Sequence, residues 1–354
     1  MAESNRMLAA TYTQGGAFSI EEVPVPQIES DEILLRVGAT AICGTDTRIV
    51  RFGHRKLTEG RRIVLGHEFV GTIEQLGARV EQYRVGQRVG VAPNAGCGHC
   101  HACTSGRSNY CPSYTAFGID LDGGQAPYVK IPGRFVTQGN VIALPEEVPD
   151  TEAALLEPFS CVVNGIRVSR MELGDTVVIY GAGPMGLMHL MLCRIAGAAR
   201  VIVVDPLVDR LEKARQLGSD MTLNPNEDDV VARLEHDTGG RGVDVVITAC
   251  SVPSVQTEGL RVLSPFGRLC LFGGLPKNTD LVGLDTNSVH YGNLQITGST
   301  GGSVEDYSIA LKLVSGQRVK LSQIVSDVFQ LENLHQAYDK ALSGAEGKVV
   351  LVAE

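Results

Sequence analysis

The chain has 354 residues, of which 44% are hydrophobic and 20% are charged. At roughly 150 residues per domain this length predicts about two domains, and the composition excludes an intrinsically disordered chain. Lysine and arginine number 31 against 40 aspartates and glutamates, and this net charge of −9 argues against binding to nucleic acid. The most apolar stretch, residues 187–204, is interrupted by His189, Arg194 and Arg200, and residues 1–7 lack the apolar core of a secretory signal. We therefore expect a cytoplasmic protein with no membrane partner.

The first part of the chain, from residue 8 to about 155, predicts short strands and frequent turns. Runs rich in β-forming residues cover 32–37 and 70–76, and residues 85–91 predict a turn that enters a strand. Glycine, proline and asparagine interrupt the stretch at intervals that are typical of an all-β unit. A β-rich domain is therefore expected here.

From about residue 170 the pattern changes to alternating strands and helices. Four short apolar runs have the character of buried parallel strands. They cover residues 176–180, 200–205, 244–249 and 268–272. Helices are predicted over 184–196 and 208–217, the second ending at Gly218. This alternation is typical of a doubly wound parallel sheet.

The pattern changes again after about residue 298. Residues 304–315 and 331–342 predict helices, and residues 348–352 predict a closing strand. This order favours a nucleotide-binding domain inserted into a β-rich domain that the C-terminal residues complete.

A glycine motif of the form G-x-G-x-x-G lies between the first apolar strand and the helix after it. In that context the glycines permit a tight turn, close approach of a pyrophosphate and close packing of helix on strand, while the helix N-terminus favours the anion. The motif predicts a dinucleotide site. Its expected cofactor-binding residues are Gly181, Gly183, Pro184, Met185 and Gly186.

Asp205 ends the second strand, about 20 residues after the motif. A carboxylate there can bind the adenosine ribose and repel a 2′-phosphate, so NAD is expected in preference to NADP. The alternative is that Asp205 only caps the next helix, and Arg210 nearby argues against strict selectivity. Gly273 and Ser299 end late strands and are expected to border the nicotinamide half of the cofactor, because ligands bind at the carboxyl ends of parallel strands.

Four cysteines lie close together in one stretch of sequence, which is the pattern of a metal site in a reducing compartment. They are Cys97, Cys100, Cys103 and Cys111. Four thiolates make a closed tetrahedral zinc site with no open coordination position, hence a structural one. An iron–sulfur cluster is the alternative, but in the ferredoxin pattern the last cysteine follows after three residues rather than seven.

A second group of metal-binding residue types is spread along the chain. Cys43, His67, Glu68 and Glu157 would supply sulfur, imidazole and carboxylate, the ligand types of an open catalytic zinc. Each of these residues also has an ordinary explanation as a core or surface residue. Their spacing does not decide between the two interpretations.

These motifs together resemble those of the zinc-dependent medium-chain dehydrogenases, nearly from end to end. Cys-Gly-Thr-Asp at 43–46, Gly-His-Glu at 66–68, the four-cysteine lobe, Leu-Glu-Pro at 156–158 and the glycine motif stand in the family's order. Within the family the chain looks most like the sorbitol/L-iditol 2-dehydrogenase branch. The resemblance implies a zinc enzyme with two zinc ions per chain, one catalytic and one structural, and a homo-oligomer, commonly a tetramer.

The resemblance also implies a domain plan and roles for individual residues. Residues 1–156 would form a GroES-like catalytic domain with a structural zinc lobe at about 94–113, residues 157–297 a Rossmann NAD-binding domain, and residues 298–354 the completion of the catalytic domain. The active zinc would lie in the cleft between the domains. Cys43 and His67 would bind it directly, while Glu68 and Glu157 would bind it, exchange, or act through its water. Thr45 would hydrogen-bond the alkoxide and begin a proton relay.

Two residues depart from the family's pattern. Many relatives carry histidine where this chain has Arg48, and an arginine stays protonated and cannot pass a proton on. Either His54 or water would substitute, or the proton would leave directly. Threonine dehydrogenases share Leu-Glu-Pro-Phe at 156–159 but have histidine where this chain has Asn94. The segment 48–62 is unusually basic, which suits either a solvated loop or a partner for a substrate phosphate or carboxylate.

The sequence thus predicts an enzyme that transfers a hydride from a secondary hydroxyl of a polyol to NAD and produces a ketose. The enzymatic alternatives are an L-threonine 3-dehydrogenase and a sugar-phosphate or sugar-acid dehydrogenase of the galactitol-1-phosphate type. A zinc scaffold protein that merely retains NAD is the non-enzymatic alternative.

Overall fold

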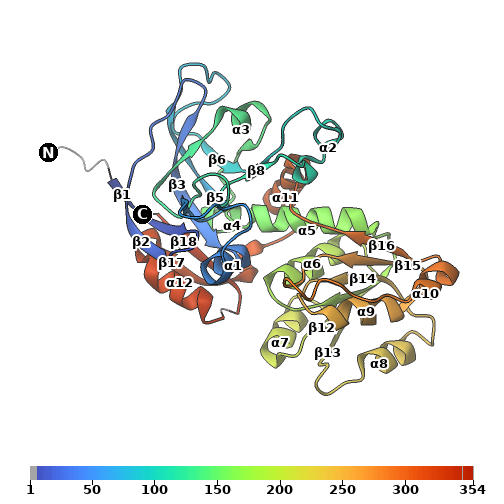
Figure 1. Ribbon diagram of the computed structural model, residues 1–354. Helices are drawn as coiled ribbons and strands as arrows, with labels where there is room; N and C mark the ends of the chain where they lie inside the picture. The colour runs from blue at the N-terminus through green and yellow to red at the C-terminus, as the bar shows by residue number, and fades with distance from the viewer. Residues whose placement is uncertain (1–5, 345, 354) are drawn as a thin grey trace. The chain divides into compact units, whose positions relative to one another are not determined.

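The computed structural model of the chain describes residues 6–344 and 346–353, which form two compact units (Figure 1). The first unit consists of the chain up to Ser160 and the chain from Gly301 onwards, and the second runs from Cys161 to Thr300. The sequence predicted these boundaries after residues 156 and 297. Among the described residues, no helix is long and apolar enough to span a bilayer.

The larger sheet of the first unit is built around β3 (Ile33–Ile42), a ten-residue strand that is buried along most of its length. The strand order is β10–β6–β5–β3–β18–β17, and β9 also pairs with β3. The other strands are β5 (Glu68–Leu76), β6 (Arg88–Val91), β9 (Tyr128–Ile131), β10 (Val141–Ala143), β17 (Val325–Gln330) and β18 (Lys348–Val352). The predicted strands of the N-terminal part and the closing strand are therefore confirmed, and the last strand of the chain lies beside one of the first.

Smaller elements complete the first unit. A three-stranded sheet has the order β2–β1–β4, and β7 pairs with β8. The strands are β1 (Arg6–Thr13), β2 (Phe18–Pro24), β4 (Arg62–Val64), β7 (Asn94–Ala95) and β8 (Thr115–Ala116). The helices are α1 (Gly44–Phe52), α2 (His101–Thr104), α3 (Gly133–Thr137), α4 (Asp150–Ala153), α11 (Val304–Ser315) and α12 (Leu334–Leu342), with short 3-10 turns at Ser108–Tyr110, Leu321–Ile324 and Leu331–Asn333.

The second unit is a doubly wound parallel sheet, as the sequence predicted. Its strand order is β13–β12–β11–β14–β15–β16, and every neighbouring pair is parallel. The strands are β11 (Thr176–Tyr180), β12 (Arg200–Val204), β13 (Met221–Leu223), β14 (Val243–Thr248), β15 (Leu263–Leu271) and β16 (Gln295–Gly298). The order reverses direction at β11, and such a switch point creates a ligand crevice at the carboxyl ends of the strands.

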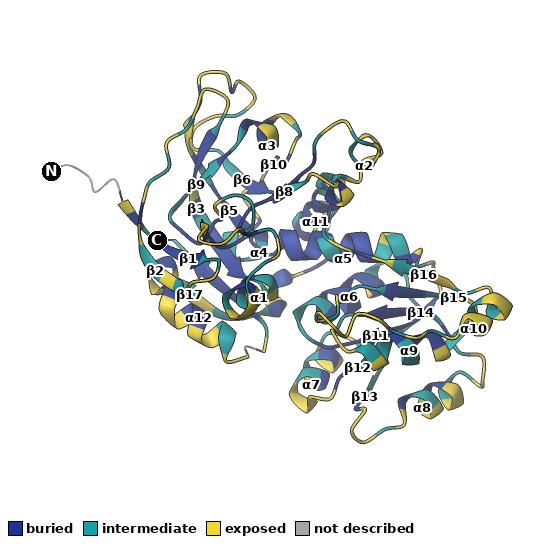
Figure 2. Cartoon of the chain, viewed as in Figure 1, coloured by how far each residue is buried: buried dark blue, intermediate teal, exposed yellow. Residues whose placement is uncertain are grey.

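Helices cover the faces of this parallel sheet. They are α6 (Pro184–Ile195), α7 (Val208–Gln216), α8 (Val230–Asp237), α9 (Pro253–Arg261) and α10 (Thr286–Gly292). The preceding helix, α5 (Leu156–Ser169), begins in the first unit and ends in the second. Helix α6 packs on β11 and β12, and α9 packs on β14 and β15. Figure 2 shows the consequence: the central strands are buried, whereas α7, α8 and α10 expose residues to solvent. Strands covered on both faces are apolar throughout, which is why the sequence runs were recognisable.

One polar side chain, His189, lies fully buried in the core of the second unit. Its Nδ1 lies 2.8 Å from the carbonyl oxygen of Met185 and donates to it, and its ring packs edge-on against Phe272. Burial lowers the pKa of His189 to about 4, because a charged imidazolium would lose its hydration there. The ring is therefore neutral at physiological pH and acts as a core residue.

This buried histidine predicts a pH dependence of stability. An unfolded histidine titrates near pH 6.5, so between that pH and about 4 the unfolded chain binds more protons than the folded one, and stability falls as the pH falls. From pH 7 to pH 5 the free energy of unfolding should drop by about 2 kcal/mol more in the natural protein than in His189→Gln. Urea unfolding at both pH values measures this difference, and equal pH dependence in the two proteins would contradict it.

Candidate metal and dinucleotide sites

The candidate catalytic zinc ligands lie beside three neighbouring strands of the larger sheet: β5, β3 and β18. In the antiparallel register Ala41 of β3 is opposite Glu68, and Ile42 is opposite Val349 of β18. Cys43 directly follows β3, so the register brings it close to the first residue of β5. The ligand atoms of Cys43, His67 and Glu68 all lie within 4.8 Å of one another. The structure therefore brings together three of the four residues that the resemblance implied for a catalytic zinc.

The buried Asp46 carboxylate holds Cys43 by a hydrogen bond and lies against His67. Cys43 caps α1, and its backbone N–H donates to Asp46 Oδ2 at 2.9 Å in a capping box. The buried Asp46 also accepts a 3.1 Å hydrogen bond from Gln125, and its Oδ1 lies 3.5 Å from His67 Nδ1. An acid at Nδ1 favours a proton there and leaves Nε2 as the metal-binding nitrogen. Asp46 was not predicted as a site residue, although an acid three residues after a helix N-cap is a recognisable capping signal.

The electrostatics of this group favour a cation. Burial lowers the pKa of His67, but the neighbouring Cys43 and Asp46 outweigh it and raise that pKa well above the ordinary value. Negative donors that stabilise a proton on the imidazole would also stabilise a divalent metal ion. The mixed sulfur, nitrogen and oxygen donor set fits zinc, and three protein ligands leave a coordination position open.

Lys348, at the start of β18, is the main site residue that sequence reasoning missed. It is 5% exposed, and its Nζ donates to Glu68 Oε1 at 2.7 Å and to the backbone oxygen of Ile42 at 3.2 Å. Burial alone would lower the pKa of Lys348, but the attraction of Glu68 and Cys43 outweighs it and raises the pKa. The amine is therefore charged and forms a buried ion pair with a candidate zinc ligand. A single lysine 280 residues from Glu68 along the chain gave no signal in the sequence.

Glu157, the fourth predicted ligand, is not among the residues whose ligand atoms all lie within 4.8 Å of one another. It is 7% exposed near the start of α5, and its charge helps to raise the pKa of Lys348 and of Tyr307. It therefore lies in the same electrostatic neighbourhood. A role for Glu157 at the metal remains a prediction.

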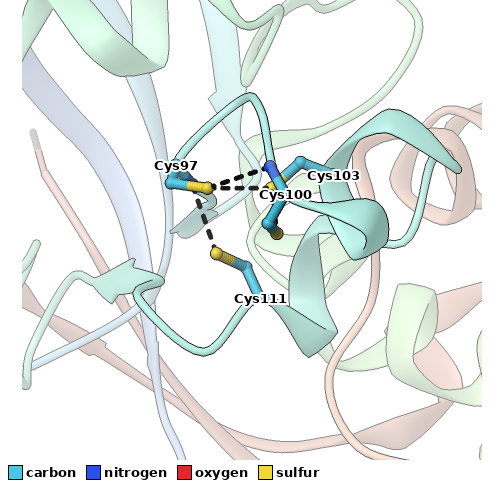
Figure 3. Close-up of side chains that lie close together, drawn as sticks. All are labelled: Cys97, Cys100, Cys103 and Cys111. Carbon is cyan, nitrogen blue, oxygen red and sulfur yellow. Dashed lines mark hydrogen bonds between the residues drawn. The ribbon is translucent and has the colours of Figure 1, made fainter.

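The four cysteines of the predicted structural zinc lobe lie close together (Figure 3). Their Sγ atoms lie within 4.8 Å of one another, with 3.6 Å between Cys100 and Cys103, and all four thiols are free. Backbone N–H groups of His99 and Cys100 lower the pKa of Cys97 to about 6, which favours the metal-binding thiolate. Burial raises the pKa of Cys103 to about 11, and a bound divalent cation would remove that proton. The geometry fits a closed structural zinc site.

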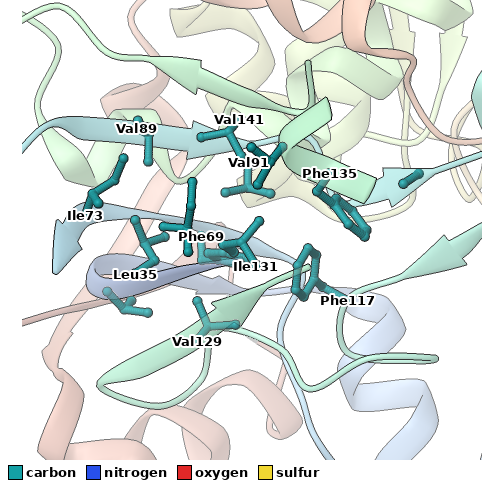
Figure 4. Close-up of a cluster of buried hydrophobic side chains, with 14 of the residues drawn as sticks. Leu35, Phe69, Ile73, Val89, Val91, Phe117, Val129, Ile131, Phe135 and Val141 are labelled. Carbon is teal, nitrogen blue, oxygen red and sulfur yellow. The ribbon is translucent and has the colours of Figure 1, made fainter. Parts of the chain in front are cut away.

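The lobe that carries these cysteines is anchored at both ends. The short strands β7 and β8 pair on either side of it, with Asn94 opposite Ala116. Phe117, just after β8, packs against Phe69 at 5.2 Å and against Phe135 at 4.6 Å between ring centroids, inside the main core of the first unit (Figure 4). The loop between these anchors has few apolar residues of its own, so a metal is the expected source of its order.

The glycine motif of the second unit adopts the geometry that a dinucleotide site needs. Gly181 has φ +104°, which a side chain rarely permits, and Gly183 caps α6 with Pro184 in its first turn. A Cβ at Gly186 would lie 1.7 Å from the backbone oxygen of Gly181, so only glycine fits. The backbone N–H groups at the start of α6 follow directly, and a helix start of this kind binds pyrophosphate.

Asp205 lies beside this motif and is engaged by the backbone. Its Oδ2 accepts from Ala182 N–H at 2.7 Å and its Oδ1 from Leu207 N–H at 2.9 Å, and Arg210 Nη1 lies 3.9 Å from Oδ2. The carboxylate therefore links the glycine loop to the end of β12. It also lies where a contact with the adenosine ribose is expected. Cap and ribose ligand are compatible roles, because each oxygen has two lone pairs.

Gly273 and Ser299 lie after the last two strands of the parallel sheet, at its carboxyl edge. Gly273 N–H donates to Thr248 at 2.7 Å, and a Cβ there would meet the backbone of Cys250 at 2.3 Å. Ser299 is 8% exposed and accepts a 3.2 Å hydrogen bond from Asn164. Both are at the sheet edge where a cofactor is expected; contact with nicotinamide remains a prediction.

Removal of one lobe cysteine tests the structural zinc site. Cys100→Ser should lower the zinc content by one ion per chain and reduce the melting temperature, because three remaining thiolates hold the lobe less tightly. Metal analysis by mass spectrometry and thermal unfolding measure both effects. Cys161→Ser, which lies outside the cluster, is the matched control. Unchanged zinc content in Cys100→Ser would contradict the assignment.

Removal of the buried amine tests the ion pair. Lys348→Met should lower the free energy of unfolding by about 3–5 kcal/mol, because it leaves the Glu68 carboxylate buried without a cation. Urea unfolding in the presence of a zinc chelator measures the loss. Lys340→Met removes an exposed partner of Asp327 and should cost less than about 1 kcal/mol. Equal losses in the two variants would show that the pair is not buried as described.

Comparisons with known proteins agree with this geometry. Residues 29–146 match the model of the alcohol dehydrogenase GroES-like domain, and residues 184–316 match that of the zinc-binding dehydrogenases. An L-threonine 3-dehydrogenase of Caldanaerobacter subterraneus is 32% identical over 96% of this chain and 96% of its own. Another, from Bacillus subtilis, is 32% identical over 98% of both chains.

Solved structures give the same result. A putative zinc-binding dehydrogenase from Sinorhizobium meliloti bound to NADP is 28% identical to this chain, with a TM-score of 0.88. An Escherichia coli alcohol dehydrogenase complexed with NADH is also 28% identical, with a TM-score of 0.89. Each match covers 99% of this chain and all of the other chain. 2R,3R-butanediol dehydrogenase from Bacillus subtilis is 25% identical with a TM-score of 0.88, over 98% of this chain and all of its own. Because these curated relatives are named as L-threonine 3-dehydrogenases, membership of the sorbitol/L-iditol 2-dehydrogenase branch stays a prediction. The chain is thus an enzyme of the zinc-dependent medium-chain dehydrogenase family, with a GroES-like and a Rossmann unit and a requirement for zinc and NAD(P).

Proposed function

We propose that the enzyme oxidises a secondary hydroxyl of a small molecule to a ketone with NAD, and that L-threonine is the first substrate to test. The observation that carries the proposal is the convergence of Cys43, His67 and Glu68 beside Thr45, at the start of α1. L-Threonine is favoured over a free polyol because relatives named as L-threonine 3-dehydrogenases share about a third of their residues with this chain over nearly its whole length.

The second candidate substrate is a diol or polyol. Two observations favour it: Asn94 stands where threonine dehydrogenases carry histidine, and 2R,3R-butanediol dehydrogenase has the same fold over the whole chain at 25% identity. Asn94 forms part of β7, and its backbone oxygen accepts a hydrogen bond from Asn140 at 2.9 Å. Its backbone therefore helps to anchor the zinc lobe.

The chemistry divides between bound groups and the chain's own residues. When bound, zinc supplies a Lewis acid for the substrate hydroxyl and NAD accepts the hydride. Cys43 and His67 would hold the ion, with Glu68 held beside it by Lys348. The Cys43 thiolate and the neighbouring Glu68 carboxylate would reduce the ion's effective charge, which favours exchange of a polar substrate.

Thr45 would orient the substrate hydroxyl and receive its proton. Among the described residues its side chain has no hydrogen-bond partner, and it is only partly buried. Arg48 cannot carry the proton further, since a guanidinium has no free lone pair. The half-buried His54 is the proposed next acceptor, because burial and the nearby cations lower its pKa and keep the ring neutral.

NAD is proposed as the coenzyme in preference to NADP because of Asp205. A carboxylate beside the adenosine ribose repels a 2′-phosphate. Arg210, 3.9 Å away, partly offsets that charge, so the preference should be graded rather than absolute.

Coenzyme reduction over a substrate panel tests the proposal. We expect the zinc-loaded enzyme to reduce NAD with L-threonine at a higher kcat/KM than with 2,3-butanediol, sorbitol or L-iditol, as followed at the nicotinamide absorbance. Turnover of free diols or polyols alone would replace L-threonine by the second candidate. Absence of turnover with every compound, at two zinc ions per chain, would contradict the proposed substrates.

Cys43→Ala provides the control on mechanism. It should reduce turnover by at least about a thousandfold while NAD binding, measured by fluorescence titration, stays unchanged, because the glycine motif lies in the other unit. Substantial zinc-dependent turnover by this variant would contradict the assignment of the catalytic metal.

A further inference from the structure

The basic segment at 48–62 contains six cationic side chains, and four of them have partners within the protein. Arg51 and Arg61 donate to the backbone oxygens of Leu342 and Asp120, respectively. Lys56 forms a 3.0 Å ion pair with Asp120 and lies over the ring of Tyr114. Arg62 pairs with Glu21 at 3.3 Å. These four cations fasten the segment to its surroundings.

The other two cations, Arg48 and Arg55, differ from these. Neither makes a hydrogen bond or ion pair with any residue that the structure describes, and both are exposed. The two charges nevertheless act on the same neighbour, because both lower the pKa of His54. They therefore form a local positive region that is not neutralised by an ion pair with any described residue, in a chain whose net charge is −9.

Helix α1 places this positive region near the proposed reaction site. Cys43 caps the helix, Thr45 lies in its first turn, and Arg48 follows Thr45 by three residues. Residues three apart lie on the same face of a helix, with Cβ atoms about 5–6 Å from each other. The guanidinium of Arg48 is thus carried by the same helix face as the hydroxyl that would orient the substrate.

We propose that Arg48, assisted by Arg55, binds a carboxylate or phosphate that the substrate carries close to its reacting hydroxyl. The inference rests on the proposed oxidation of a secondary hydroxyl and narrows its substrate to an anionic compound. Guanidinium groups bind carboxylate and phosphate by paired hydrogen bonds, and an exposed arginine without a counter-charge has this capacity available. Arg48 then positions the substrate and selects it by charge.

Matched substrate pairs test the proposal. Each pair differs in one anionic group: L-threonine against L-threonine amide, and galactitol 1-phosphate against galactitol. The first pair reports a carboxylate and the second a phosphate, so they distinguish the two sources of negative charge. The natural enzyme should show a kcat/KM at least tenfold higher for the anionic member of one pair.

The variants separate binding from structure. Arg48→Gln should raise KM for the preferred anionic substrate about ten- to hundredfold, with little change in kcat and little change for its neutral partner. Arg55→Gln should give a smaller change of the same kind. Arg62→Gln is the matched control, because it removes a cation of the same segment that already has a partner in Glu21. It should behave as the natural enzyme does.

Three results would overturn the proposal. The first is a preference of the natural enzyme for the neutral members, and the second is an equal loss in Arg48→Gln on both members of a pair; in both cases the proposed oxidation stands while the anion site fails. If no pair is turned over, the proposed substrates are contradicted, and the anion site must be tested by binding alone. The third overturning result is then the absence of binding. Calorimetric titration of the zinc-loaded, NAD-bound protein with L-threonine and galactitol 1-phosphate then decides. Binding lost in Arg48→Gln supports the anion site, and no binding by the natural protein overturns it.

Discussion

The ion pair between Lys348 and Glu68 is the interaction on which the candidate metal site depends. It joins the last strand of the chain to a strand near its beginning, on either side of β3, and both charges are buried. Taking two charges out of water costs several kcal/mol, which only close pairing and further hydrogen bonds can offset. The hydrogen bond from Lys348 to the backbone of Ile42 supplies such a contact and ties the pair to the residue before Cys43. The C-terminal strand therefore completes the site as well as the sheet.

Charge is distributed unevenly around this pair. Negative charge gathers at the candidate metal site: Cys43 and Asp46 raise the pKa of His67, and Glu68 and Cys43 raise that of Lys348. The far end of α1 and the segment after it are positive. A single nine-residue helix thus connects a place suited to a cation with a place suited to an anion. This arrangement suits a substrate whose hydroxyl and acidic group are a few bonds apart, and it arises from neighbouring residues on one helix.

The two units differ in how directly their sites follow from local sequence. In the second unit the glycine turn, the start of α6 and the end of β12 are built from residues close in sequence, and Asp205 joins them through one backbone hydrogen bond to Ala182. In the first unit the four cysteines come from one loop, but the loop is held by β7, β8 and the aromatic core around Phe117. Cys43, His67 and Lys348 come from three separate stretches of chain. The first unit therefore needs its tertiary structure to make a site, whereas the second needs mainly its local turns.

The sequence by itself determined the features that depend on local chemistry. Apolar runs without polar interruption predicted the strands of the parallel sheet because such strands are covered on both faces. The helix at 304–315 and the strand at 348–352 were predicted at their observed bounds. Cysteine spacing predicted the zinc lobe and the G-x-G-x-x-G motif predicted the dinucleotide turn, because each of these is built from residues that are close together in the sequence. Only the tertiary structure decided that Lys348 pairs with Glu68, that Asp46 faces His67, and that Arg48 and Arg55 have no partner among the described residues. Each of these facts depends on strand register and on which distant side chains meet, and long-range pairing of this kind leaves no periodic or spacing signal in one sequence.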